Sequence, residues 1–243
     1  MTTALNHILS GFRGIYEVPQ AARYLTFTLK KDVPSSPAIQ QVHSRQLIRW
    51  IRAGLSLPDL ATLPGRSLAI TFEDLISMRV IAILRALRVS WPKIHRAEAW
   101  LRQMTGHPRP FAVKRVWTET TEVFTDFPKG LIAASRQGQL AFAALLGDYI
   151  EPIGDLTFKP HNGVHVAATW TAYPDILLDP AIQFGESCVK GTRIPTLALW
   201  RMWKGGDSMG FLANSFELSS EQIERALEWE EHLRATKTSA LSG

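Results

Sequence analysis

Apolar residues recur at helical intervals along the first 110 residues, separated by polar and basic positions. This spacing predicts four helices, over residues 18–25, 43–55, 75–87 and 91–104. Thr71 and Asp74 resemble a capping box in front of the third helix, with Asp in place of Glu. A Pro-bearing loop is expected over 27–41 and a short strand over 67–70. The N-terminal part is therefore predicted to be helical, with one strand in the position of a wing.

Between residues 111 and 170 the helical spacing gives way to alternation, with many β-branched and aromatic side chains. Strands are predicted over 111–118, 122–127, 153–158 and 164–170, and one helix over 139–146. The sequence His161-Asn162-Gly163 separates the last two strands, and Asn-Gly is a strong signal for a tight hairpin. We expect a small α/β region here, with a sheet that offers a dimer surface.

The C-terminal part returns to helical spacing in three short runs. Thr192 is a candidate N-cap for the first helix, which Gly205 and Gly206 end. Asp207 or Ser208 is placed to cap the second. A capping box of Ser219 and Gln222 opens the third helix, whose apolar face includes Ile223, Ala226 and Leu227. The pattern predicts a trihelical unit that resembles a helix-turn-helix.

Together these patterns predict an α+β chain that is mainly α. We divide it into an N-terminal domain over 1–110, a small α/β middle region over 111–170 and a trihelical domain over 171–243. The chain has 243 residues, of which 46% are hydrophobic, so it has enough apolar material to bury a sizeable core.

The charge balance differs between the two ends of the chain. The whole sequence has 27 basic and 22 acidic residues, a net charge of +5. Residues 1–110 contain 15 of the basic and 6 of the acidic residues, a net of +9, which leaves −4 for the remainder. A net positive region favours binding to a phosphate backbone, and a net negative region disfavours it. We therefore expect different partners for the two ends.

Several observations concern the compartment. No apolar run reaches the length that spans a membrane, and the first residues lack the basic-then-apolar pattern of a secretory signal. A single cysteine, Cys188, excludes an intramolecular disulfide framework and suits a reducing environment. The expectation is a cytoplasmic protein without membrane contact.

The predicted helix over 43–55 has the side chains that major-groove recognition requires. Its apolar residues face one way, whereas Arg45, Gln46, Arg49 and Arg52 lie on another surface of the helix. Arg and Gln on an exposed helix form bidentate contacts with base edges. Arg66, near the tip of the expected wing, is a candidate for the flanking backbone. Within a region of net charge +9, this pattern favours duplex DNA over a merely solvated helix face.

Catalytic and metal-binding patterns are weak in this sequence. His161 and His165 flank a turn and with Cys188 would give three metal ligands, but the sequence supplies no fourth. Cys188 next to Lys190 has no nearby histidine to activate it. No phosphate-binding glycine loop occurs. We therefore expect no enzyme activity, no cofactor and no metal.

Two stretches carry resemblances to known families. The segment D-P-x-I-x-F-G-E-x-x-V-K-G-T-R-I-P from Asp179 to Pro195, with the helices through Leu227, resembles a small bacterial domain of no assigned catalytic function. That domain is often found in antitoxins paired with PIN-like ribonuclease toxins. The helix order over residues 16–104, with L-R-V-S-W-P-K-I in a turn, resembles the MerR-like winged helix-turn-helix.

These resemblances imply a VapB-type antitoxin that neutralises a PIN-like ribonuclease toxin and binds operator DNA for autorepression. Such a protein would read its operator as a homodimer. Residues 171–243 have 7 basic and 10 acidic residues, so toxin binding is expected there rather than DNA binding. The candidates are Lys190, Arg193 and Arg201, with Trp200 and Trp203 as apolar anchors. The alternative is a MerR-like transcriptional regulator that responds to a small ligand.

Overall fold

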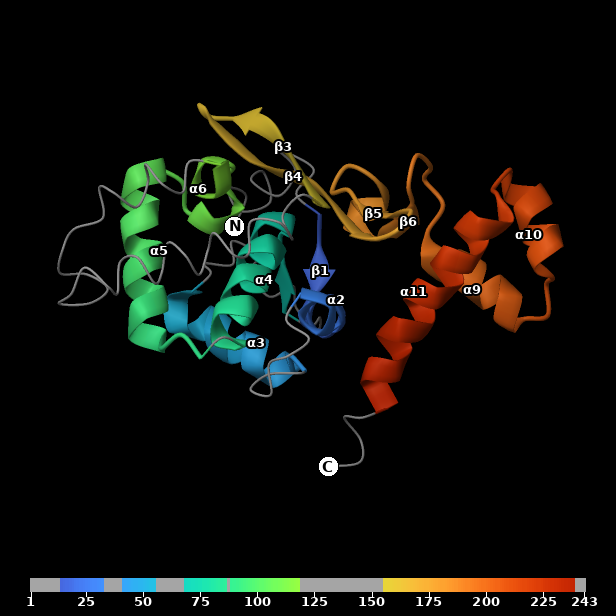
Figure 1. The fold of residues 1–243 in the computed structure, drawn as a ribbon, viewed down its shortest axis with the longest axis horizontal. Coiled ribbons are helices and arrows are strands. Elements are labelled where there is room, and N and C mark those ends of the chain that lie inside the picture. The colour runs from blue at the N-terminus through green and yellow to red at the C-terminus, as the bar shows by residue number, and fades with distance from the viewer. Residues whose placement is uncertain (1–13, 33–40, 56–67, 87, 119–154, 239–243) are drawn as a thin grey trace, which may run out of the picture.

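Two small antiparallel sheets lie within a mainly helical chain (Figure 1). The computed structural model describes residues 14–32, 41–55, 68–86, 88–118 and 155–238. The predicted class, mixed α and β with helices dominant, is confirmed. Among the described residues, no helix combines the length and the apolar character needed to cross a bilayer. The predicted elements at 122–127 and 139–146 lie outside the described residues.

The N-terminal helices occur where the apolar spacing places them. They are α2 (Val18–Asp32), α3 (Ser44–Trp50) with a π-helical turn η1 (Ile51–Leu55), α4 (Phe72–Ala86) and α5 (Trp91–Thr105). Helix α2 is longer than predicted, because residues beyond Leu25, such as Leu29, are also buried. The Thr26 and Thr28 hydroxyls donate to the carbonyls of Ala22 and Tyr24 within this part of the helix. Burial of the apolar face outweighs the low helix propensity of β-branched residues.

The predicted capping box of α4 is present. The Thr71 amide donates to Asp74 Oδ2 at 3.0 Å, and the Asp74 amide donates to Thr71 Oγ1 at 3.2 Å. The strand predicted over 67–70 is β2 (Ala69–Ile70), and its partner is β1 (Tyr16–Glu17), directly before α2. The expected wing tip lies at residues outside the described part of the chain.

The strand predicted over 111–118 is wrong. Pro110 opens a 3-10 turn, η2 (Pro110–Ala112), and a short helix α6 (Arg115–Thr118) follows. Only Val113 bridges the sheet, opposite Val166, and Lys114 N donates to the His165 carbonyl at 2.8 Å. The side chains of Phe111, Val113 and Val116 are buried. The spacing of these apolar residues in the sequence does not distinguish a strand from the turn and short helix that bury them here.

A four-stranded sheet joins the predicted middle and C-terminal regions. Its strands, in spatial order, are β3 (Leu156–His161), β4 (Val164–Tyr173), β5 (Ile176–Leu178) and β6 (Ser187–Val189). The predicted hairpin is confirmed, because Asn162 and Gly163 both have positive φ, 47° and 82°, as a type I′ turn requires. Strand β4 crosses residue 170, so the sheet is shared by the two predicted regions.

The trihelical unit consists of α9 (Thr196–Lys204), α10 (Met209–Phe216) and α11 (Ser220–Thr238). Ser208 Oγ accepts from the Phe211 amide at 3.1 Å, and Ser219 and Gln222 form the predicted reciprocal box at 3.0 and 3.1 Å. The predicted cap Thr192 is wrong. Its hydroxyl donates to the Val189 carbonyl within the preceding turn, and Pro195 occupies the N-cap position instead.

Helix α11 connects the two ends of the chain. It packs on α9 on one side and on α2 on the other (Figure 1). Trp229 is fully buried at this junction, with its ring centroid 5.6 Å from that of Tyr24 and 5.0 Å from that of Phe27. Helix α2 therefore covers part of the apolar face of α11.

Helix α4 is the central element of the N-terminal core. Nearly all of its side chains are buried within the chain itself. Arg79 forms a bidentate ion pair with Asp155, both contacts at 3.0 Å, and Trp170 Nε1 donates to the same carboxylate at 3.0 Å. The apolar residues of α4 are therefore used for packing inside one chain.

One buried carboxyl makes stability depend on pH. Burial raises the pKa of Glu98 on α5 from 4.5 to about 7, although the Arg102 guanidinium at 2.8 Å partly opposes this effect. The pKa of Glu98 is thus higher in the folded state than in the unfolded state. The stability that the protonated Glu98 side chain contributes is therefore present below about pH 4.5, and it is lost as the pH rises through about 7.

We expect Glu98→Gln to remove this dependence. The unfolding free energy of the wild type minus that of the variant should fall by roughly 1–2 kcal/mol between mildly acidic and mildly alkaline pH. Urea denaturation at both pH values measures it, with Glu224→Gln on the exposed face of α11 as the matched control. A difference that is constant with pH would contradict the assignment.

Candidate functional site

Helix α3 is held by its apolar face and exposes its basic face. Leu47 is fully buried and Trp50 is nearly so, whereas Arg45 and Arg49 are exposed. The entry to the helix is fixed by α2, because the Val42 amide donates to the Thr26 hydroxyl at 2.9 Å. The apolar residues of α3 thus fix the helix to the core, and its basic side chains are exposed.

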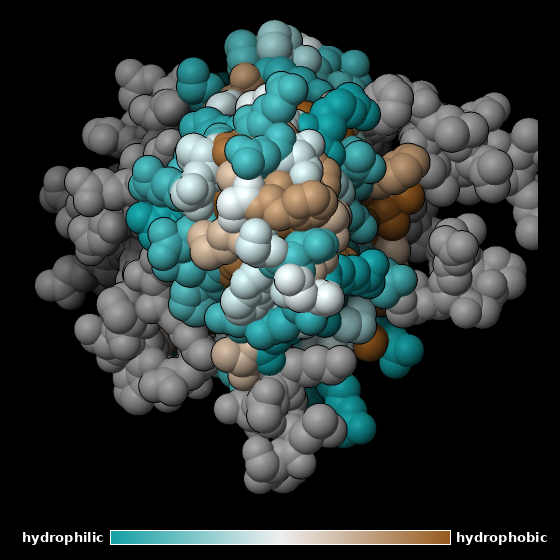
Figure 2. Space-filling model, turned by 90° about the vertical axis from the view of Figure 1, so that its right-hand side faces the viewer, coloured by the Kyte–Doolittle hydropathy of each residue, from teal (hydrophilic) through white to brown (hydrophobic). Residues whose placement is uncertain are grey.

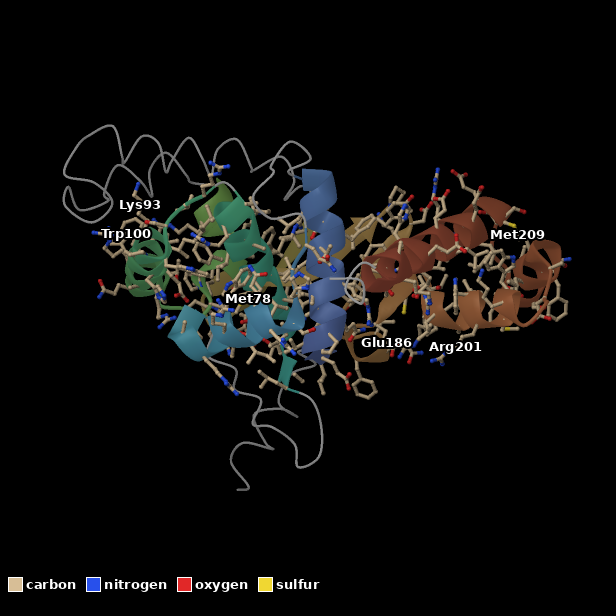
Figure 3. All side chains as sticks on the ribbon, turned by 90° about the horizontal axis from the view of Figure 1, so that it is seen from below. Met78, Lys93, Trp100, Glu186, Arg201 and Met209 are labelled. Carbon is tan, nitrogen blue, oxygen red and sulfur yellow. The ribbon has the colours of Figure 1, made fainter. Side chains whose placement is uncertain are left out.

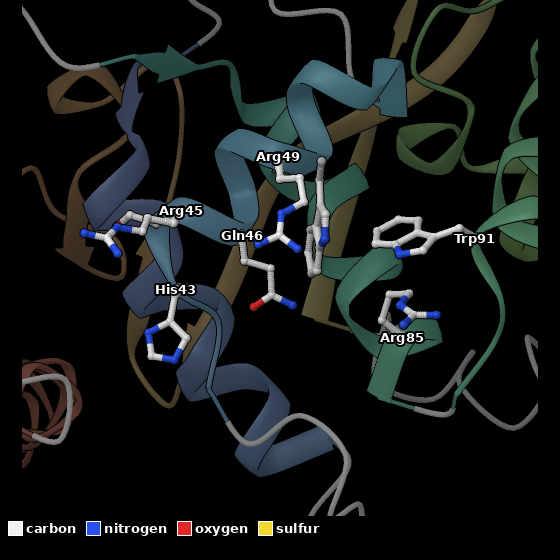
Figure 4. A pocket seen from close by; sticks show the side chains of 8 residues that line it. His43, Arg45, Gln46, Arg49, Arg85 and Trp91 are labelled. Carbon is white, nitrogen blue, oxygen red and sulfur yellow. The ribbon is translucent and has the colours of Figure 1, made fainter. Parts of the chain in front are cut away.

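These side chains form one wall of a groove, which we call the α3 groove (Figure 4). It has a volume of about 800 Å³ and is lined by His43, Ser44, Arg45, Gln46, Arg49, Trp50, Arg85 and Trp91. Arg49 and Gln46 point toward the side where Arg85 and Trp91 lie, whereas Arg45 projects toward the other end (Figure 4). The groove therefore brings together α3, the end of α4 and the start of α5.

The opposite wall is a stacked arrangement of an arginine and aromatic rings. The Arg85 guanidinium lies over the Trp91 ring, 4.8 Å from its centroid. Trp91 packs edge-on against Trp50, with centroids 5.6 Å apart. Arg85 also donates to the Val89 carbonyl. These contacts hold Arg85 in place next to the basic face of α3.

The described lining of the α3 groove contains three arginines and a histidine and no carboxylate. Arg45 and Arg49 form no ion pair with any described residue. An unneutralised cluster of guanidinium groups in a concave surface attracts anions and donates bidentate hydrogen bonds to phosphate or to base edges. The arrangement suits a polyanion rather than a neutral molecule.

The predicted DNA-contacting residues separate into three groups. Arg45, Gln46 and Arg49 line the groove together. Arg52 is exposed in the π-helical turn and does not line it. Arg66 lies outside the described residues. Sequence reasoning missed Arg85 and Trp91, since no local spacing indicates that they face α3.

A second basic surface lies in the C-terminal part. Lys190 and Arg193, in the turn between β6 and α9, and Arg201 on α9 are exposed, and none of the three forms an ion pair with another described residue. Figure 3 shows Arg201 on the same edge of the C-terminal part as Glu186. These cations are available to a partner although the domain is acidic overall.

The predicted aromatic anchors Trp200 and Trp203 are covered by cations. The Arg234 guanidinium lies 3.4 Å from the Trp200 ring centroid, and Lys204 Nζ lies 4.2 Å from the Trp203 centroid. Both tryptophans are only partly exposed. Their rings thus contribute to a cation–aromatic layer between α9 and α11 rather than to a bare apolar patch.

A buried hydroxyl–carboxylate chain fixes α9 against α11. The Thr196 hydroxyl donates to Glu230 Oε1 at 2.6 Å and lies 2.8 Å from the Ser187 hydroxyl. Arg234 pairs with the same Glu230. Thr196 and Glu230 are both buried, so the chain sets where the exposed face of α9 points.

The described residues offer little for catalysis or metal binding. Burial raises the pKa of the Cys188 thiol to about 11, the opposite of what an activated nucleophile needs. No group of three or more His, Cys, Asp or Glu that could hold an ion occurs in the described part of the chain. His161 and His165 lie at the two sides of the β3–β4 hairpin, whereas Cys188 is buried on β6.

Comparisons with known proteins find one family model and a similar solved structure, and neither description states a function. Residues 176–229 match the model of a family described as a protein of unknown function, DUF433. The fold is similar to the crystal structure of Rv2018 from Mycobacterium tuberculosis, with a TM-score of 0.66 and 17% identity, over 87% of this chain and 96% of that chain. At this identity the likeness concerns the fold alone. No protein with a curated description matches the sequence.

Proposed function

We propose that this chain is an antitoxin that binds operator DNA through the α3 groove and neutralises a PIN-like ribonuclease through its C-terminal part. One observation carries the DNA-binding arm: three arginines, a histidine and a glutamine converge on a groove whose described lining has no acidic side chain. Phosphate contacts supply affinity, and Arg or Gln contacts to base edges supply specificity. The fold around the groove is proposed to be a MerR-like winged helix-turn-helix.

The toxin-binding arm rests on different observations. The family resemblance of the segment from Asp179 onward implies a nuclease partner, and such nucleases gather carboxylates to hold divalent cations. Lys190, Arg193 and Arg201 are exposed cations that lack ion-pair partners among the described residues. An arginine delivered to a carboxylate cluster forms strong, charge-assisted hydrogen bonds. A homodimer that reads two half-sites completes the proposal.

The DNA-binding arm predicts that Arg49→Ala weakens binding of the full chain to the duplex upstream of its own coding sequence. We expect a loss of about tenfold, because one bidentate contact to a base contributes roughly 1–3 kcal/mol. If Arg49 contacts phosphate instead, the salt slope of log K should fall by about 0.9. Fluorescence anisotropy over a range of salt concentrations measures both quantities.

Arg96→Ala is the matched control for this experiment. Arg96 is exposed on α5, donates only to the Pro92 carbonyl among described partners and does not line the α3 groove. It removes the same charge from the same end of the chain and should change affinity by less than about twofold. Equal losses in both variants, or no binding by the wild type at low salt, would overturn the DNA-binding arm.

A transcriptional regulator that responds to a small ligand is the second candidate function. A cavity of about 170 Å³ between α2 and α11 favours it, with Arg23, Tyr24 and Glu230 in its wall. Ligand pockets usually have volumes of about 300–1,000 Å³, so this cavity is smaller than such a function requires. We therefore place the antitoxin first. A metabolite that copurifies with the chain in the absence of a protein partner would reverse the order.

A further inference from the structure

Phe184 is held in an unusual exposed position. Its side chain is 71% exposed, more than that of any other large apolar residue in the described part of the chain. Gln183 and Phe184 have positive φ values of 48° and 56°, and Gly185 follows at 93°. Two consecutive non-glycine residues in the left-handed region are strained, and such strain persists where the surroundings impose it. We call residues Gln183–Gly185 the Phe184 turn.

Hydrogen bonds on both sides hold the Phe184 turn. The Phe184 carbonyl accepts from the Ile15 amide at 2.9 Å, and the Glu186 amide donates to the Gln183 carbonyl at 3.1 Å. A Cβ at Gly185 would lie 2.3 Å from the Tyr16 hydroxyl, so close packing against β1 also limits the turn. The backbone thus presents the ring outward in a fixed direction, at a cost in strain that the fold does not recover by burying the ring.

Exposed apolar and charged side chains lie close to the Phe184 turn, and Glu186, which follows it, is exposed as well. Ile15, joined to Phe184 through the backbone, is 43% exposed. Gln183 Nε2 donates to the Arg193 carbonyl at 3.2 Å, which ties the Phe184 turn to the loop that contains Arg193 and Lys190. Both cations are exposed and form no ion pair with other described residues. An exposed aromatic ring on a turn that is bonded to a loop with exposed cations suits a partner surface that combines an apolar socket with carboxylates.

We propose that Phe184 is the apolar anchor of the toxin interface, inserted into a socket next to the carboxylate cluster of the nuclease, with Arg193 pairing with a carboxylate at its rim. This inference rests on the proposed antitoxin function and adds the residue that fixes the register of the complex. Because the turn is already rigid, binding orders no further backbone, which favours affinity. Trp200 and Trp203 are less suited to this role, since cations cover their rings.

The chain provides a matched control for Phe184. Phe211 on α10 is also a phenylalanine and is 52% exposed. The α10 end of the molecule shows apolar residues scattered among hydrophilic ones (Figure 2). Removing the Phe211 ring deletes the same aromatic surface at a site without the turn and without Arg193. The comparison therefore separates an anchoring role from a general loss of apolar surface.

The experiment is calorimetric titration of the full chain with the PIN-like protein encoded by the neighbouring reading frame. Phe184→Ala should weaken binding by at least about 30-fold and Arg193→Ala by about tenfold, whereas Phe211→Ala should stay within about twofold of wild type. Phe184→Asn is the second variant, because Asn tolerates the left-handed backbone and keeps the turn while it removes the ring. Circular dichroism checks that each variant folds.

The outcomes distinguish this inference from the proposal on which it depends. If the neighbouring frame encodes no such nuclease, or the wild type does not bind it, the antitoxin function fails and the inference fails with it. If the wild type binds and both Phe184 variants bind equally well, only the inference is wrong. If light scattering shows that Phe184→Ala converts a dimer into a monomer while nuclease affinity is kept, the anchor serves a second copy of this chain instead.

Discussion

Trp229→Ala is expected to lower the free energy of unfolding of the full chain by about 3–5 kcal/mol, the range for removing a large aromatic side chain from a core. Trp229 has no exposed surface. Its ring stacks on Tyr24 at 5.6 Å and meets Phe27 edge-on at 5.0 Å, and Tyr173 lies 6.1 Å away. The substitution would leave a cavity between α2, α11 and the sheet. The surrounding rings could fill it only by moving inward and losing their present contacts.

The size of this effect matters because typical domains have only about 5–15 kcal/mol of stability. Helix α2 leads into α3 and the groove, and α11 is the last helix of the C-terminal unit. Trp229 therefore lies where the part with the proposed DNA-binding site packs against the part with the proposed toxin-binding site. Urea denaturation followed by circular dichroism measures the loss. Trp229→Phe, which keeps one ring, should lose less, and Phe211→Ala on the surface should lose under about 0.5 kcal/mol.

A loss for Trp229→Ala of under about 1 kcal/mol would contradict this packing. It would mean that the α2–α11 junction is not formed in solution. Amide hydrogen exchange offers an independent check, because α2 amides should lose protection together with those of α11 when the junction is weakened.

Asp74→Ala is expected to cost about 3–5 kcal/mol, because it breaks a buried ion pair and a helix cap at once. Asp74 is fully buried at the start of α4. Its Oδ2 accepts from the Thr71 amide and hydroxyl at 3.0 and 2.7 Å, and its Oδ1 accepts from Arg109 Nε at 2.7 Å. Arg109 is only 4% exposed, so removal of the carboxylate takes a charged partner away from a buried guanidinium.

A double variant separates the ion pair from the cap. Asp74→Ala with Arg109→Met removes both charges and should be more stable than Asp74→Ala alone, because the buried guanidinium is removed together with the carboxylate that pairs with it. Asp74→Asn retains an acceptor for the cap and should lie between wild type and Asp74→Ala. Chemical denaturation of these four proteins, and of Arg109→Met alone, completes the comparison. Additive losses in the double variant would show that Asp74 and Arg109 do not interact in the folded state.

Local features of the sequence predicted the helices well where the signal was itself local. The Thr71–Asp74 and Ser219–Gln222 boxes and the Ser208 cap formed as expected, because their hydrogen bonds join residues three apart. Asn162-Gly163 specified its hairpin for the same reason, since only a few residues readily adopt the two positive φ values of that turn.

The candidate DNA-binding residues were predictable in part. Helical spacing alone separated buried Leu47 from exposed Arg45 and Arg49. It could not place Arg85 and Trp91 opposite them, because those residues come from α4 and α5 and meet α3 only through packing of the core. Regional charge indicated the kind of partner to expect, but the shape of the groove depends on three helices.

The sequence by itself determined the positions of most helices, the hairpin, the mixed α and β class and the charged face of α3, because each follows from spacing or chemistry within a few residues. Only the tertiary structure decided that residues 115–118 are helical, that α2 continues to Asp32, and that α11 is buried against it. It also decided that Phe184 is exposed. These outcomes depend on contacts between segments far apart in the chain, where burial free energy outweighs local preference.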